Sequence, residues 1–282
     1  MLKLRIITAL TLLLFLLPTL FYPSPEPFCA LVLLLVAAGA WEWARINGRG
    51  QVVSWWLAVL SVLACVAIWL SGGLSTVHPA LWIGVTAVWV LAGSWLLFRG
   101  VAAWAHIPVW LRLLAGWLLL LCAWMAMAQA RIIGINFLLS AMVLVWMADI
   151  AAYFAGKAWG GRFSQSKLAP SISPGKSWEG VWGGMAGVVL VAFVWRWVDQ
   201  ASAFASPSLF SHLAARGLWF MVLAVLFMAA LSVVGDLIES LIKRSAGVKD
   251  SSHLLPGHGG VLDRLDALLP TLPLTMMLYS LS

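Results

Sequence analysis

Charged residues are scarce in this chain of 282 residues: they make up 10% of the sequence, against about 25% in soluble globular domains. Apolar residues account for 63%, and there are 19 Trp. This composition excludes a soluble domain. Because a helix needs about 20 largely apolar residues to span a membrane, we predict an all-α, polytopic integral membrane protein.

Cysteine is equally scarce and is not clustered. Cys29, Cys65 and Cys122 each lie alone in an apolar segment, without CxxC spacing. Neither a disulfide framework nor a zinc site is indicated, since His253 and His258 also have no cysteine partners at metal-ligand spacing. We interpret the three cysteines as packing residues.

Long apolar runs predict about nine transmembrane helices. They cover approximately residues 6–22, 28–41, 52–71, 76–98, 109–128, 132–155, 181–198, 216–238 and 265–281. The second is short, and the last is interrupted by Pro270 and Pro273. The first has the basic start of a signal peptide but no small-residue cleavage site after it, so we expect a retained helix.

The basic residues predict the orientation of the chain. When the N-terminus is placed in the cytosol, only Arg131, Arg196 and Arg216 of the 17 Lys and Arg residues fall on the outer side. This is the bias of the positive-inside rule, so we predict a cytosolic N-terminus, with a bacterial inner membrane as the location. The net charge of +7 then reflects topology and contact with anionic membrane lipids rather than binding of nucleic acid.

Acidic residues are nearly absent from the first half of the chain. Only Glu26 and Glu42 precede Asp149, and every later acidic residue except Asp199 falls on the predicted cytosolic side. We therefore expect residues 1–131, with about five spans, to be a scaffold. Residues 132–282 are expected to form the catalytic region, with its site at the cytosolic face.

Two polar groups open this second region. Asp149 lies late in the sixth predicted span with Tyr153 four residues later, on the same helical face. A carboxylate in hydrocarbon usually faces a functional cavity, although a small boundary shift would place it at the interface instead. The loop 156–180 carries four cations among small residues, which suits phosphate binding. It lacks a P-loop pattern, and an ordinary cytosolic loop would be equally basic.

A third polar group begins near the end of the eighth predicted span. Asp236, Glu239 and Lys243 fall on one stripe of a helix, and Asp263 and Asp266 are three apart at the entry to the ninth span. Two antiparallel helices would bring these carboxylates to the same depth. Mg²⁺ prefers such oxygens and usually shares them with a substrate phosphate.

Salt bridges are the alternative explanation for this group. Lys243 neighbours the first carboxylates and Arg264 the second, so each could simply neutralise them. The turn at residues 256–260, PGHGG, permits close approach of the backbone. His258 within it is a base, a phosphate donor or only a turn residue.

The third group resembles the signature of the phosphatidate cytidylyltransferases, the CDP-diacylglycerol synthases. The residues that carry the resemblance are Ser240, Ile242, Lys243, Arg244, Lys249, Asp250, Ser252, Leu255, Pro256, His258, Gly259, Gly260, Val261, Asp263, Arg264, Leu265 and Asp266. Asp149 with Tyr153, and residues 172–180, also resemble family segments. Ser177 stands where Thr is frequent in that family, which keeps the hydroxyl.

The resemblance implies a reaction: CTP and phosphatidate give CDP-diacylglycerol and pyrophosphate at the cytosolic leaflet. It also implies Mg²⁺, a monovalent cation such as K⁺, and a homodimer. The implied metal ligands are Asp236 and Asp263, with Glu239 and Asp266 beside them. The residues expected to offset phosphate charge or assist catalysis are Lys176, Lys243, Arg244, Lys249, His258 and Arg264. Those expected to bind substrate are Asp149, Tyr153, Ser173, Ser177, Glu179, Ser240, Gly259 and Gly260.

Two rival functions remain on sequence grounds. Another CTP-dependent membrane lipid transferase, such as a lipid-alcohol kinase, would release CDP instead of pyrophosphate. A transporter with ion-binding carboxylates would be expected to show repeated halves and paired broken helices. The polar residues of this chain are instead concentrated in one half and on one side, which favours the cytidylyltransferase.

Overall fold

The computed structural model describes residues 2–164, 166–202 and 204–281. Within them there is no β-strand, only isolated bridges at Ala169–Ser173 and Leu255–Gly259. The helices are α1 (Leu2–Phe21), α2 (Glu26–Ile46), α3 (Gln51–Leu70), α4 (Pro79–Arg99), α5 (Val101–His106), α6 (Val109–Ile133), α7 (Ile135–Trp159), α8 (Trp178–Ala201), α9 (Leu209–Ala214), α10 (Leu218–Ser245), α11 (Leu262–Leu265) and α12 (Leu268–Leu281). The predicted all-α class is confirmed.

Eight of these helices, among the residues described, are long and apolar enough to cross a membrane: α1 to α4, α6 to α8 and α10. The chain is therefore an integral membrane protein. The ninth expected span, 265–281, is represented by α11 and α12. α12 has only 14 residues, so it is about 21 Å long, which is shorter than the hydrocarbon core of about 30 Å. The number of crossings and the side of the N-terminus stay predictions.

The second helix is longer than the sequence indicated. We expected it to cover residues 28–41, because the apolar run stops at Glu42, yet α2 continues to Ile46. The boundary was wrong because Glu42 is fully buried and hydrogen-bonded rather than exposed at a helix end. A buried carboxylate with enough donors is compatible with a helix interior.

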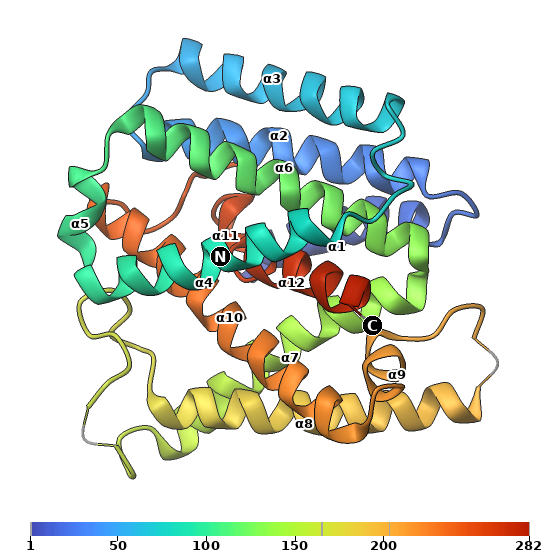
Figure 1. The fold of residues 1–282 in the computed structure, drawn as a ribbon. Helices are drawn as coiled ribbons and strands as arrows, with labels where there is room; N and C mark the ends of the chain where they lie inside the picture. The colour runs from blue at the N-terminus through green and yellow to red at the C-terminus, as the bar shows by residue number, and fades with distance from the viewer. Residues whose placement is uncertain (1, 165, 203, 282) are drawn as a thin grey trace.

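Most of the long helices run in the same general direction across the bundle (Figure 1). α2, α3 and α6 pack together on one side, α7 and α8 pack together on the other, and α10 crosses obliquely between them. α12 lies in the middle, against α4, α6 and α10. An α-helix that is apolar all round belongs in such a buried position. Its Thr271 and Thr275 hydroxyls donate to carbonyls one turn earlier, each at 2.8 Å.

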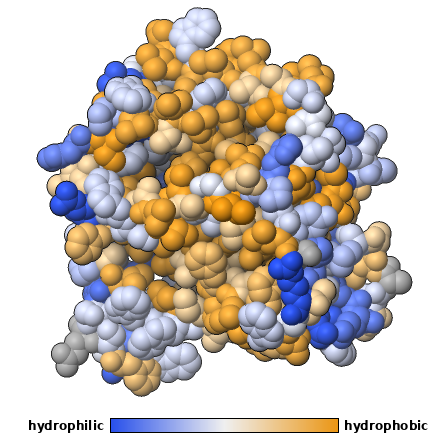
Figure 2. Space-filling view, viewed as in Figure 1, coloured by the Kyte–Doolittle hydropathy of each residue, from blue (hydrophilic) through white to orange (hydrophobic). Residues whose placement is uncertain are grey.

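Large apolar side chains are also common on the outside of the bundle. They cover much of the face seen in Figure 2, while hydrophilic residues gather toward its edges. Phe98 and Leu91, for example, are 89% and 70% exposed. Such a surface is compatible with lipid as the surrounding solvent.

Small residues bring α7 and α8 close together. A Cβ atom built on Gly184 of α8 would lie 2.8 Å from the carbonyl oxygen of Ala148, and one on Gly180 would lie 3.0 Å from that of Ala152. Small residues at this spacing are how membrane helices approach closely. The contact places the Asp149 region of α7 beside the first turn of α8.

The loops between α7 and α8 and between α10 and α11 emerge at the same end of the bundle, the left side of Figure 1. α1 reaches this end too, where Arg5 Nε donates to the carbonyl of Gly257 at 2.9 Å and Thr8 Oγ1 to that of Pro256 at 2.8 Å. The residues singled out in the sequence are therefore collected at one end of the helices.

Candidate active site

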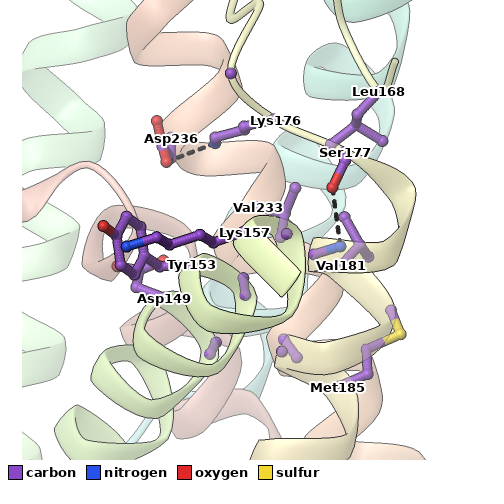
Figure 3. A pocket seen from close by; sticks show the side chains of 17 residues that line it. Asp149, Tyr153, Lys157, Leu168, Lys176, Ser177, Val181, Met185, Val233 and Asp236 are labelled. Atoms are coloured by element: carbon purple, nitrogen blue, oxygen red, sulfur yellow. Dashed lines mark hydrogen bonds and ion pairs between the residues drawn. The ribbon is translucent and has the colours of Figure 1, made fainter. Parts of the chain in front are cut away.

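A cavity of about 410 Å³ lies between α7, the following loop, α8 and α10 (Figure 3). Its polar lining consists of Asp149, Tyr153, Lys157, Lys176, Ser177 and Asp236. Three of these, Asp149, Tyr153 and Ser177, were predicted to bind substrate, and Lys176 and Asp236 were assigned to catalysis and metal binding. The structure thus brings five predicted residues to one cavity.

Lys176 crosses the cavity to reach α10. Its Nζ lies 2.5 Å from Asp236 Oδ2, as the dashed line in Figure 3 marks. Asp236 is also close enough to Asp149 and Asp266 for their negative charges to repel one another. Three carboxylates therefore lie near one another while the Lys176 ammonium is paired with one of them, Asp236, which leaves an excess of negative charge at this end of the cavity.

A second charged cluster lies beside the cavity, around Lys243. The Lys243 ammonium is paired with Glu239, one turn earlier on α10, and lies 2.5 Å from Asp263 Oδ1. Glu239 is buried, and its Oε1 has no hydrogen-bond donor among the described residues. The salt-bridge alternative is confirmed for Lys243 with Glu239 and is wrong for Arg264, because Asp263 pairs with Lys243 while Arg264 Nη2 donates to the carbonyl of His258 at 2.7 Å.

Asp263 is the most heavily hydrogen-bonded carboxylate of the second cluster. Its Oδ2 accepts from the backbone N–H and the hydroxyl of Ser251, both at 2.9 Å, and from the N–H of Gly260 at 2.7 Å. Burial alone would raise the pKa of Asp263, but the Lys243 ammonium and these hydrogen bonds lower it to about 2. Asp263 is thus ionised at neutral pH and fixed in orientation.

Residues 251–262, which we call the signature loop, follow the end of α10 and reach the first residue of α11. The loop is hydrogen-bonded to Asp263 through Ser251 and Gly260. Gly259, with φ of +85°, accepts from the N–H of Leu255 at 2.9 Å and closes the turn around His258. A positive φ is the conformation that glycine adopts without strain. His258 Nδ1 is buried without a hydrogen-bond partner in the described part of the chain.

Glu42 is the residue that sequence reasoning missed. It comes from α2, in the half predicted to be scaffold, and is 0% exposed. Its carboxylate accepts four hydrogen bonds from the signature loop. The sequence did contain a signal for Glu42, because it is one of only two acidic residues before Asp149 and lies in an apolar run. A carboxylate in such a run is a functional-site hypothesis.

The loop between α7 and α8 is held largely by its own hydrogen bonds. Glu179 Oε1 accepts from the N–H groups of Phe163 and Ser164 at 3.0 and 2.8 Å, and Ser177 Oγ caps α8 by accepting from the N–H of Gly180 at 3.1 Å. Ser173 lies in the same loop, where its carbonyl accepts from the N–H of Lys176 at 3.2 Å. Glu179 and Ser173 therefore support the loop that carries Lys176.

The remaining predicted residues lie around these clusters. Ser240 Oγ donates to Asp236 Oδ1 at 3.3 Å, and Arg244 Nε donates to the carbonyl of Ile172 at 3.4 Å, which links α10 to the preceding loop. Lys249 is exposed beyond the end of α10. Tyr153 is 62% exposed, with the Lys157 ammonium 6.0 Å from its ring centre.

The carboxylates of the two clusters are chemically suitable metal ligands, although lysine ammonium groups pair with several of them. Carboxylate oxygens are the ligands that Mg²⁺ prefers, and the excess negative charge around Asp149, Asp236 and Asp266 favours a cation. No three His, Cys, Asp or Glu residues in the described ranges are arranged as a ready-made metal site. Both oxygens of Asp263 are occupied, and so are those of Asp236, by Lys176 and by the Ser240 hydroxyl at 3.3 Å, so a cation must displace existing contacts at either residue.

Comparison with known proteins gives the family. The profile of the "Cytidylyltransferase family" matches residues 3–282. The phosphatidate cytidylyltransferase of Pseudomonas aeruginosa is 39% identical over 281 residues, which is 97% of this chain and 95% of that protein. That of Haemophilus influenzae is 34% identical over 298 aligned positions, covering 99% of each. That of Bacillus subtilis is 37% identical over 148 residues, 52% of this chain and 49% of that protein. The chain belongs to the cytidylyltransferase family.

Proposed function

We propose that this protein is a phosphatidate cytidylyltransferase. An oxygen of the lipid phosphate attacks the α-phosphorus of CTP, the bond from that phosphorus to the oxygen of the β-phosphate breaks, and pyrophosphate leaves. The product is CDP-diacylglycerol. The observation that carries the proposal is the position of the signature residues: Asp236 lines the cavity and pairs with Lys176 there, and Lys243, seven residues further along α10, pairs with Asp263.

The chemistry of the substrates explains why the site presents lysine ammonium groups but has no evident strong base. A phosphomonoester has its second pKa near 6, so the attacking phosphate is already largely ionised at neutral pH. The barrier lies in bringing one anion against another. Catalysis of such a reaction consists mainly of positioning and charge neutralisation.

The lysines of the two clusters are suited to this task. Lys176 and Lys243 are each held by carboxylates in the structure. Anionic substrates would compete with these carboxylates for the ammonium groups, so both lysines are poised to contact phosphate oxygens. Arg244, which contacts the loop that carries Lys176, adds a third positive charge nearby. Lys249, His258 and Arg264 are further candidates for contacts with the phosphate groups of the substrates, at the outer edge of the site.

We further propose that Mg²⁺ is held by Asp236, with Asp149, Asp263, Asp266 and Glu239 as the neighbouring carboxylates. When bound, it would neutralise phosphate charge and assist the leaving pyrophosphate. A monovalent cation such as K⁺, a homodimer and a site that faces the cytoplasm at a bacterial inner membrane complete the proposal. The orientation is supported by the sequence, which places Lys and Arg in the loop between α7 and α8 and in the loop between α10 and α11, and both loops lie at the end of the bundle that holds the site (Figure 1).

The test is a product analysis with purified protein in detergent. Phosphatidate, CTP and Mg²⁺ are supplied, with and without EDTA, and lipid and nucleotide products are separated. We expect CDP-diacylglycerol and pyrophosphate in equal amounts, and only without EDTA. CDP together with a newly phosphorylated lipid would show a kinase, and no turnover with any lipid would favour the transporter. A Glu26→Gln variant, which changes an exposed acid remote from the site, is the matched control for acid substitutions.

A further inference from the structure

We propose that Glu42 is a positioning residue for the reaction, because its buried carboxylate holds the signature loop in the conformation that orients Asp263. The inference rests on the proposed function, and it concerns a residue that touches neither the cavity nor the two lysines. It assigns a role in the site to α2, a helix from the half of the chain that otherwise packs as scaffold.

The hydrogen bonds of Glu42 go to both ends of the signature loop. Oε1 accepts from the hydroxyl of Ser252 at 2.5 Å and from the N–H of Val261 at 2.9 Å. Oε2 accepts from the N–H of Leu262 at 2.8 Å and from the hydroxyl of Ser251 at 3.2 Å. One side chain thus ties the start of the loop to its end, from a position 209 to 220 residues away in sequence.

The burial of Glu42 shows that this contact is not incidental. The side chain is 0% exposed, and no Lys or Arg of the described residues forms an ion pair with it. A buried charge without a counter-ion is costly unless several donors satisfy it. An apolar side chain would fill the same space in α2 at lower cost, so the carboxylate is better explained by what it holds.

The loop leaves room for this carboxylate at Gly260. A Cβ atom there would lie 2.5 Å from Glu42 Oε1 and 2.8 Å from its carboxylate carbon. Such distances are far inside van der Waals contact, so any side chain at this position would displace Glu42. The glycine therefore allows the backbone to close over the carboxylate.

Ser251 connects Glu42 to Asp263. Its hydroxyl lies within hydrogen-bond distance of both carboxylates, 3.2 Å from Glu42 Oε2 and 2.9 Å from Asp263 Oδ2. A hydroxyl has one proton to donate, so the two carboxylates share it. Asp263 also binds the N–H groups of Ser251 and Gly260, so whatever fixes the loop fixes the direction in which Asp263 Oδ1 faces Lys243.

The experiment compares Glu42→Gln with wild type and with Glu26→Gln. The glutamine places an NH₂ group, which cannot accept a hydrogen bond, opposite hydroxyl and backbone N–H donors of the signature loop. Because the loop loses these bonds, we expect hydrogen exchange in residues 251–262 to become at least about tenfold faster. Misplacement of Asp263 should lower kcat about 100-fold. KM for CTP should change little, because α2 does not line the cavity. Glu42→Asp, which keeps the charge, should recover part of kcat, and Glu26→Gln should behave as wild type.

Three outcomes for Glu42→Gln would overturn the proposal. The first is unchanged hydrogen exchange in the signature loop, and the second is a wild-type kcat despite faster exchange there. The third is a lower kcat accompanied by equally faster exchange in all helices, which would show general destabilisation. If Glu42→Gln does not fold, Ser252→Ala is used instead, because it removes only one of the donors to Glu42. It must also give faster exchange in the signature loop and a lower kcat, with both changes smaller than those expected for Glu42→Gln. Loop exchange is measured without substrate. An effect on exchange in a protein that makes no CDP-diacylglycerol would therefore identify a failure of the proposed function rather than of the loop anchor.

Discussion

Lys243 Nζ and Asp263 Oδ1 lie 2.5 Å apart, so a lysine of α10 and an aspartate of α11 form one buried ion pair. Their side chains are only 11% and 6% exposed. This pair joins the two segments that the sequence pattern singled out, and it engages the carboxylate assigned to a metal. Substrate or cation binding at this position must therefore be linked to rearrangement of the pair.

Asp263→Asn should inactivate the protein and weaken its fold. Removal of one partner leaves the Lys243 charge with only Glu239 to pair with, and breaking a buried pair costs about 3–5 kcal/mol. We expect at least about a 100-fold loss of kcat, together with a lower melting temperature in detergent. Unchanged cytidylyl transfer in this variant would refute a metal or catalytic role for Asp263.

The same residue predicts how stability depends on acidity. The pKa of Asp263 is lowered from 3.8 to about 2, so its ionised form favours the folded state by about 2 kcal/mol. This stability is fully present above about pH 4 and is lost as pH falls from 4 through 2. Melting temperatures recorded between pH 3 and 7 should fall more steeply below pH 4 in wild type than in Asp263→Asn. Parallel curves would contradict the assignment.

Lys176→Met should mainly affect use of the nucleotide. Lys176 lines the cavity and pairs with Asp236, so its removal eliminates the proposed phosphate contact and leaves Asp236 without its ammonium partner. A loss of about 100-fold in kcat/KM for CTP is expected. Arg162→Met, an exposed cation in the same loop, is the control. Combining Lys176→Met with Asp236→Asn should cost less than the sum of the single changes, because the residues are in contact.

Asp236→Asn should raise the Mg²⁺ concentration needed for half-maximal activity by more than about tenfold, the usual scale for weakened metal sites. The measurement is a Mg²⁺ titration after treatment with EDTA. Glu26→Gln should titrate as wild type. A variant with reduced maximal rate but the same Mg²⁺ dependence would place the metal elsewhere.

Gly184→Ala should open the contact between α7 and α8. The new methyl group would meet the carbonyl oxygen of Ala148 at 2.8 Å, which requires the helices to separate. Overpacking of this kind typically costs about 1–3 kcal/mol. Gly84→Ala in α4, where the added atom meets nothing within 4 Å, is the matched control and should be neutral or slightly stabilising. Equal melting temperatures for the two variants would contradict the packing argument.

Much of the architecture was predictable because hydropathy acts locally. A run of apolar residues must find a nonaqueous environment, so eight of the expected spans correspond to long helices. The last segment was less predictable. An apolar helix buried against α4, α6 and α10 has the same composition as one facing lipid, so periodicity did not reveal that α12 is only 14 residues long.

The candidate site divides in the same way. Helical spacing along the sequence was enough to predict that Asp236, Glu239 and Lys243 share one stripe of a helix. Which charges pair depends on how the helices and loops pack, as the contact between Lys243 of α10 and Asp263 of α11 shows. Lys176 reaches Asp236 across 60 residues and Glu42 reaches Leu262 across 220. Such pairings are long-range because a buried charge is satisfied by whichever backbone and side-chain groups the packing brings within about 3 Å, however far apart these groups lie in the sequence.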